Sequence, residues 1–213
     1  MVGVNGVNGR AHHPRELRVN VAPVGEIIDT SVSDFAAQAC VFGKAPPFGS
    51  FVKVLLPERT VYGLVFAIHS GSLDPGGRPV MRGHDGLRDK QIYDANPDLE
   101  QVLRTEFTAL TIGFDESGRR RAYLPPFPPP LHWSVYECSE AETAELTDSF
   151  DYFRAVLAAP EVPADALLAA NVRLAGRARG DDRAFAVRAG RELATLLKYD
   201  YPRLTAILRT LRD

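Results

Sequence analysis

The sequence predicts an α+β chain in which a small closed β-barrel of about six or seven strands is followed by a bundle of about three to four helices. Up to residue 138, short strand-like segments alternate with Gly and Pro. From Ser139 onward, apolar residues recur at spacings of three and four, as on one face of a helix. Strands followed by helices are typical of segregated α+β chains, and this strand number suits a small barrel. We therefore expect a flexible tail at 1–16, a barrel domain at 17–138 and a helical domain at 139–213.

The bulk composition excludes several classes of protein. The chain has 213 residues, 45% of them hydrophobic, and a formal net charge of −2. That charge disfavours attraction of the whole protein to nucleic acid or to an anionic membrane. No secretory signal pattern and no apolar run long enough to cross a membrane are present, so we expect a cytoplasmic protein. Cys40 and Cys138 match no zinc-site spacing, and we expect both to be buried free thiols; the alternative is a disulfide between them, which a reducing cytosol disfavours.

The first strands are predicted on either side of a short turn. A weakly alternating segment at 17–23 ends at a proline and favours an edge strand. Residues 24–28 begin the next strand. Residues 33–41 carry apolar side chains at every second position, which places them on one face of a strand; they are Phe35, Ala37, Ala39 and Val41.

The clearest hairpin joins residues 50–56 to residues 60–69. Gly63 lies near the middle of its second strand, where a glycine often marks a bulge that helps a sheet to curl. The proline-rich segment 43–49 before the hairpin is a predicted turn. The Gly-, Pro- and Arg-rich segment 71–86 after it is a predicted surface loop.

A short helix is then predicted from Asn96, as its N-cap, to about Arg104. Residues 105–114 return to alternation and form a second predicted hairpin with residues 119–124. The segment PPFPPP, residues 125–130, is too rich in proline for a sheet or a helix and favours an extended strap. The last strand is predicted at 131–138.

The helical part begins with a capping box formed by Ser139 and Glu142. Its apolar stripe uses large side chains at helical spacing, beginning with Leu146, Phe150 and Phe153. Pro and Gly separate four predicted helices, at 140–158, 163–177, 182–198 and 201–212.

Motifs for known chemistries are absent from the sequence. It contains no phosphate-binding loop, dinucleotide-binding loop, zinc-protease motif or nucleophile elbow. We therefore assign no catalytic, cofactor-binding or metal-binding residue and expect a protein that is not an enzyme. One enzymatic alternative remains, a site at the barrel mouth formed by His69, Asp74 and His132.

Two groups of residues are candidates for binding a protein partner. The first predicted helix carries several acids that suit a basic partner, among them Glu142, Glu145 and Asp148. The loop Asp-Pro-Gly-Gly-Arg-Pro offers Asp74 and Arg78. For each group the alternative is a solvated surface or a tight turn without a partner.

Three consecutive arginines beside the second hairpin turn are the candidates for binding nucleic acid. They are Arg119, Arg120 and Arg121, whose guanidinium groups suit phosphates. The alternative is a solvated hairpin tip. The later arginines are interleaved with alanines and lack the aromatic platform of single-strand binders.

Four segments together resemble the HAS barrel, the small β-barrel at the N-terminus of HerA-type DNA-translocating ATPases and of the catalytic subunits of rotary ATP synthases. They are Val24–Ile28, Thr30–Gln38, Pro47–Lys53 and Val61–Val65. The resemblance covers roughly residues 22–137 and is sharpest in 24–68. HerA-type proteins carry an ATPase core with a phosphate loop after the barrel, whereas here helices follow it, so no ATPase residue is carried over.

The resemblance implies a non-catalytic assembly or adaptor role, because family barrels help to assemble ring-shaped ATPases and dock partners such as nucleases. We expect a HerA-like hexameric ATPase or an associated nuclease as the partner, or self-assembly into a ring, in DNA repair or processing. The alternative is a nucleic-acid-binding barrel that uses Arg119, Arg120 and Arg121.

Overall fold

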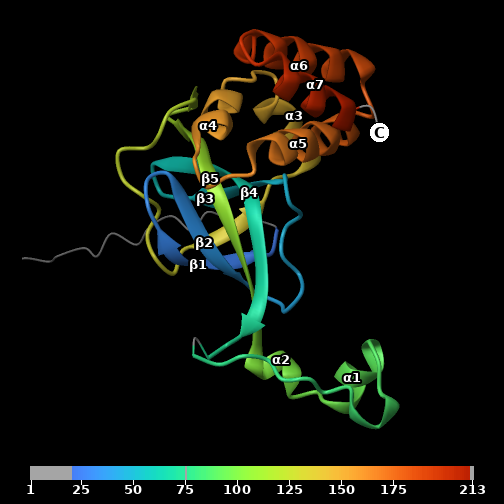
Figure 1. The fold of residues 1–213 in the computed structure, drawn as a ribbon. Helices are drawn as coiled ribbons and strands as arrows, with labels where there is room; N and C mark the ends of the chain where they lie inside the picture. The colour runs from blue at the N-terminus through green and yellow to red at the C-terminus, as the bar shows by residue number, and fades with distance from the viewer. Residues whose placement is uncertain (1–20, 75, 212–213) are drawn as a thin grey trace, which may run out of the picture.

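A computed structural model describes residues 21–74 and 76–211. The predicted tail at 1–16 lies outside the described residues, as does most of the strand predicted at 17–23. The described chain contains the predicted β-barrel and the helices that follow it (Figure 1).

Six antiparallel strands form a closed barrel. The order β1-β7-β3-β4-β5-β2 returns to β1, because β2 pairs with both β1 and β5. A seventh strand, β6, pairs with the end of β5 only. The predicted fold class is therefore confirmed. The strands are β1 Gly25–Thr30, β2 Asp34–Ala39, β3 Phe51–Leu55, β4 Arg59–Ser72, β5 Leu103–Glu116, β6 Arg119–Arg121 and β7 Ser134–Glu137.

Large apolar side chains fill the barrel interior, including Phe35 and Phe107, neither of which is exposed. Gly63 makes room for them. A Cβ atom at this position would lie 2.9 Å from the Phe35 ring and from the Ala109 side chain. The register also shifts between Tyr62 and Gly63, as the sequence predicted for a bulge at this glycine.

The helical part contains five helices instead of three to four, because the predicted helix 140–158 is broken in two. At the break, the hydroxyl of fully buried Thr147 donates to the Thr143 carbonyl group. Arg179, from further along the chain, donates to the Thr147 hydroxyl and to the Ala144 carbonyl group and so holds the end of the first helix. The Ser149 hydroxyl accepts from the Asp151 N–H before the second begins. The helices are α3 Glu140–Leu146, α4 Tyr152–Ala158, α5 Ala164–Ala178, α6 Arg183–Leu196 and α7 Tyr201–Thr210.

The strands β4 and β5 continue past the barrel and remain paired as far as Ser72 and Leu103. The segment between them, residues 73–74 and 76–102, is called the arm here. It carries the short helices α1 Lys90–Ala95 and α2 Leu99–Val102 and projects from the barrel end opposite the large helices (Figure 1).

The helix predicted from Asn96 to Arg104 is present only in part, as α2, and its predicted N-cap is wrong. Asn96 follows the end of α1, where its side-chain amide donates to the Ile92 carbonyl group, and α2 has only four residues. Cross-strand pairing of β5 with β4 begins at Leu103 and overrides the local helix signal.

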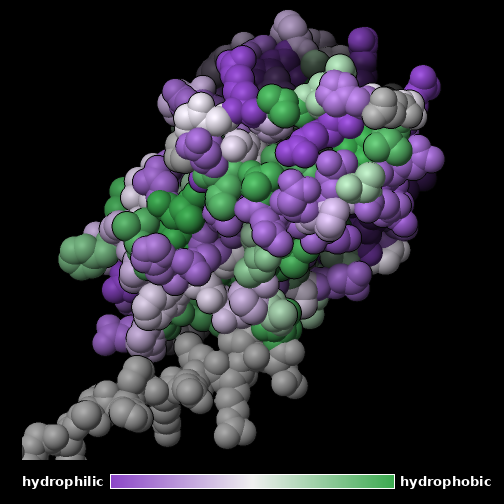
Figure 2. Space-filling view, turned by 90° about the horizontal axis from the view of Figure 1, so that it is seen from below, coloured by the Kyte–Doolittle hydropathy of each residue, from purple (hydrophilic) through white to green (hydrophobic). Residues whose placement is uncertain are grey.

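In the view from below, apolar side chains lie in patches among hydrophilic ones (Figure 2). Exposed apolar residues of the arm are Leu73, Val80, Met81, Tyr93 and Val102.

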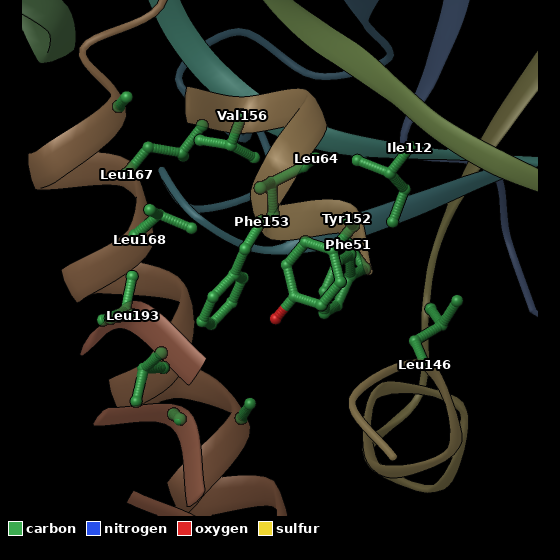
Figure 3. Packing of buried hydrophobic residues seen from close by; sticks show 14 of the residues in the cluster. Phe51, Leu64, Ile112, Leu146, Tyr152, Phe153, Val156, Leu167, Leu168 and Leu193 are labelled. Atoms are coloured by element: carbon green, nitrogen blue, oxygen red, sulfur yellow. The ribbon is translucent and has the colours of Figure 1, made fainter. Parts of the chain in front are cut away.

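The helices cover the outer face of β3, β4 and β5. Side chains alternate along a strand, so Val52 points into the barrel while Phe51 points outward into a second core. Phe51 meets the Tyr152 ring edge-on, with the ring centroids 5.5 Å apart. Leu64 and Ile112 join this core from the barrel, and Phe153, Val156, Leu167, Leu168 and Leu193 join it from the helices (Figure 3).

A buried chain of hydrogen bonds crosses this interface. The Tyr152 hydroxyl donates to Asn171 Oδ1 at 2.5 Å, and Asn171 Nδ2 donates to the Gly49 carbonyl oxygen at 3.0 Å. Asn171 is fully buried. Gly49 has a φ of +87°, and a Cβ atom there would lie 2.9 Å from that of Ala170. The predicted turn at 43–49 therefore ends on a glycine that lets α5 pack directly against the barrel.

Replacing Asn171 with Leu should destabilise the protein by about 2–4 kcal/mol, because it leaves the Tyr152 hydroxyl and the Gly49 carbonyl group buried without a partner. Urea unfolding followed by circular dichroism measures the change. Arg173→Ala, at an exposed position of the same helix, is the matched control and should change stability by no more than about 0.5 kcal/mol. An Asn171→Leu protein as stable as the control would contradict this account of the interface.

Candidate functional site

A pocket of about 250 Å³ lies between the β5–β6 hairpin and the turn that joins α3 to α4. It is called the β6–α3 pocket here. It brings together residues that the sequence analysis placed in separate groups: Arg120 and Arg121 on the strand side, Glu145 and Asp148 on the helix side. Its apolar walls come from Tyr62, Ile112, Leu146 and Tyr152.

On the strand side, Arg120 is already engaged within the chain. Its guanidinium group makes two hydrogen bonds to the Asp115 carboxylate, at 2.6 and 3.0 Å, and lies 4.7 Å from the centre of the Tyr62 ring. The Tyr62 hydroxyl donates to the same carboxylate at 2.9 Å. Burial by itself would raise the pKa of Asp115, but the hydrogen bonds from Arg120 and Tyr62 outweigh it and lower the pKa.

The three candidate nucleic-acid residues therefore differ in their surroundings. Arg119 is exposed, Arg120 is paired with Asp115, and Arg121 is half-buried. The three guanidinium groups do not form one uniform cationic surface. Arg119 also lies outside the residues that line the β6–α3 pocket.

Glu142 joins the helices to the barrel and does not line the pocket. It forms an ion pair with Lys53 of β3 and completes the predicted capping box with Ser139. Burial by itself would raise the pKa of Glu142, but hydrogen bonds from the Lys53 ammonium group and the Ser139 N–H lower it. Its carboxylate is therefore held ionised within the chain at neutral pH.

The helix side of the pocket is held in place by Arg179, the residue that directly follows α5. Its guanidinium group donates to the Ala144 carbonyl group, to the Thr147 hydroxyl and to the Asp148 carboxylate, the last at 2.7 Å. Glu145 is exposed and has no ion-pair partner among the described residues. The α3–α4 turn is therefore fixed, and beside it Glu145 at the end of α3 is an acid that no described cation neutralises.

Asp74 and Arg78 lie in the arm, away from this pocket. The Asp74 carboxylate accepts from the Gly76 N–H at 3.0 Å, and Arg78 is exposed. The structure thus separates the two predicted partner-binding groups. Glu145 lies in α3 and Asp148 just after it, whereas the arm that carries Asp74 and Arg78 projects from the other end of the barrel (Figure 1).

The three residues of the enzymatic alternative do not form a common contact. His132 contacts Glu26 of β1 at 2.7 Å, whereas His69 lies opposite Glu106 in the β4–β5 pairing. Two strands, β2 and β5, separate β1 from β4 on that side of the barrel. Asp74 lies in the arm. Within residues 21–74 and 76–211, no cluster of three or more His, Cys, Asp or Glu residues is arranged to hold a metal ion.

The expectation of two buried cysteines is half correct. Cys138 is buried, and burial raises the pKa of its thiol to about 12, so the thiol stays protonated at neutral pH. Cys40 is exposed, contrary to the prediction. Burial alternates along β2, with Phe35, Ala37 and Ala39 inside the barrel, so the next residue, Cys40, falls on the outward face.

The sequence analysis missed the carboxylate that pairs with Arg120. A two-residue turn at Ser117 and Gly118 places Asp115 directly opposite Arg120, and the structure has this register. The predicted hairpin therefore carried a signal for this ion pair. Tyr62 and Arg179 had no such signal, because each reaches the site from another part of the chain.

Residues 24–121 match the family model of the HAS barrel domain. The resemblance inferred from the sequence is confirmed for the barrel. The match spans just under half of the chain and ends at Arg121, so β7 and the large helices lie beyond it, although β7 closes this HAS barrel between β1 and β3. Comparison with curated proteins finds no match.

A HAS barrel is a non-catalytic barrel domain, and its presence is consistent with an assembly or adaptor module. No helix within the described ranges combines the length and the apolar character that crossing a bilayer requires.

The Asp115 network should make stability depend on pH. The folded-state pKa of Asp115 is lowered, so its contribution is present above the pKa of an unfolded Asp, about 3.9, and is lost as the pH falls through the folded-state value. Asp115→Asn should lower the free energy of unfolding by about 1–2 kcal/mol at pH 7. This difference from the unaltered protein should become smaller below about pH 4. Urea unfolding at a series of pH values measures this gap.

Tyr62→Phe is the matched control for that series, because it removes one hydrogen bond and leaves the Asp115–Arg120 ion pair in place. The difference in unfolding free energy between the Tyr62→Phe protein and the unaltered protein should narrow less as the pH falls. A gap for Asp115→Asn that stays constant from neutral to acid pH would show that the carboxylate charge contributes nothing to stability.

Proposed function

We propose that this protein is a non-catalytic assembly or adaptor module that associates with a HerA-like hexameric DNA-translocating ATPase in DNA repair or processing. The match of residues 24–121 to the HAS barrel domain carries this proposal. The resemblance implies that such barrels help to assemble ring-shaped ATPases and dock partners such as nucleases.

The way in which the helices join the barrel supports an adaptor role. The Lys53–Glu142 ion pair and the hydrogen bond from Asn171 to Gly49 both cross the interface, beside a shared apolar core. The barrel and helices therefore move as one rigid unit. Such a unit holds two surfaces at a fixed separation.

The two candidate surfaces lie at opposite ends of that unit. The β6–α3 pocket lies beside the large helices, and the arm with Asp74 and Arg78 lies beyond the far end of the barrel. We assign one end to the ATPase and the other to an associated nuclease or to a second copy of this chain. A rigid body with two separated docking surfaces suits a protein that links components of a larger assembly.

Complex formation with the ATPase is the direct test. The purified chain, treated with nuclease, is mixed at micromolar concentration with a purified HerA-like ATPase from the same organism, and light scattering after size-exclusion chromatography measures the mass. We expect a complex whose mass exceeds that of the ATPase ring. Charge reversal at Arg78 and at Glu145, in separate variants, should identify which end makes the contact. Separate elution of the two proteins would overturn the proposal.

Nucleic acid is the alternative partner, through Arg119, Arg120 and Arg121. The net charge of −2 and the pairing of Arg120 with Asp115 both disfavour it. Fluorescence anisotropy with single- and double-stranded DNA between about 50 and 200 mM salt tests it, because each phosphate contact steepens the salt dependence. We expect no specific binding. A steep salt slope that Arg119→Ala reduces would replace the adaptor proposal with the nucleic-acid one.

A further inference from the structure

The β6–α3 pocket is suited to receive a side chain from a partner protein. Its volume of about 250 Å³ is slightly below the range of about 300–1,000 Å³ that is usual for small-molecule sites. Ile112 and Leu146 contribute aliphatic walls, and Tyr62 and Tyr152 contribute aromatic ones. Such a hollow accommodates one large apolar side chain, the kind of anchor that supplies most of the binding energy at protein interfaces.

The pocket is formed before any partner arrives. Arg120 is fixed by two hydrogen bonds to Asp115 and by the face of the Tyr62 ring. Arg179 fixes the opposite wall through the α3–α4 turn. A partner therefore does not have to order this site, which removes part of the entropic cost of binding.

The charges around the mouth are distributed unevenly. Three acids line the helix side: Glu145, Asp148 and Asp151. Arg179 neutralises Asp148, but no described cation forms an ion pair with the other two. On the strand side Asp115 neutralises Arg120, which leaves half-buried Arg121. An excess of negative charge therefore lies on the helix side of an apolar hollow.

We propose that the β6–α3 pocket is a docking socket for a partner-protein segment in which a large apolar residue is adjacent to a basic residue. The apolar side chain enters between Ile112 and Leu146, and the basic side chain lies against Glu145 and Asp151. The partner's main-chain carbonyl groups or an acidic side chain face Arg121. This inference deepens the proposed function by naming the chemistry of one docking site, and it rests on that function only for its biological setting.

Selection from a random peptide library against the full chain tests the specificity of the socket. We expect the enriched peptides to share a Leu, Ile, Met or aromatic residue next to Lys or Arg. Titration calorimetry with the most enriched peptide, made synthetically, then measures its dissociation constant. Absence of enrichment, or enriched peptides that lack the basic residue, would overturn the proposal.

Two variants locate the binding on the structure. Ala122 is exposed and lines the mouth, so Ala122→Trp fills the pocket without altering the core. Glu145→Lys reverses one of the two negative charges that no described cation pairs with. Each should weaken binding of the peptide at least about tenfold, which is the effect of losing about 1.4 kcal/mol. Glu100→Lys makes the same charge change in α2 of the arm and should leave the affinity unchanged.

Circular dichroism and urea unfolding establish that the variants are folded. If the folded Ala122→Trp and Glu145→Lys proteins both bind the peptide as tightly as the unaltered chain does, the pocket proposal is wrong. The ATPase experiment is independent of this one. Binding of the peptide without binding of the ATPase would sustain the socket and reject the proposed partner. An ATPase complex together with unchanged peptide affinity in both variants would support the proposed partner and reject the docking socket.

Discussion

The structure depends on the buried contact between the outer face of the HAS barrel and the helices that cover it. Phe51 and Tyr152 pack edge-to-face at its centre, and Asn171 connects Tyr152 to the Gly49 carbonyl group. A polar network that is fully satisfied in a buried interface fixes one relative arrangement of the two parts, because any other arrangement would leave buried polar groups without partners. The conformation of Gly49 is part of this constraint.

That contact also determines which surfaces remain for partners. The helices cover the outer face of β3, β4 and β5, and the pairing of β2 with β5 closes the barrel so that its six strands have no free edge. A partner therefore cannot add a strand to the barrel itself. Side-chain surfaces remain: the β6–α3 pocket at one end and the arm at the other.

Charges that look like a binding surface in the sequence are mostly used inside the molecule. Glu142 binds Lys53, Arg120 binds Asp115, and Asp148 binds Arg179. Each pair joins two elements that are distant in the sequence or fixes a turn, so its members are less available to a ligand. Of the three acids named as candidates, Glu142, Glu145 and Asp148, Glu145 is the one that has no ion-pair partner among the described residues, which is why it is central to the docking socket.

The local sequence by itself determined the strand and helix types, the bulge at Gly63 and the capping box at Ser139, since alternation, glycine placement and capping chemistry are short-range properties. It also carried the register that pairs Asp115 with Arg120. The break of the first helix at Thr147 and the shortening of the helix predicted from Asn96 to the four residues of α2 were decided by tertiary contacts, because Arg179 and the long β4–β5 pairing outweigh local propensity. The candidate site likewise required the fold. Tyr62, Glu145 and Arg179 are far apart in the chain, and only the packing of the helices on the barrel brings them to one pocket and its fixed wall.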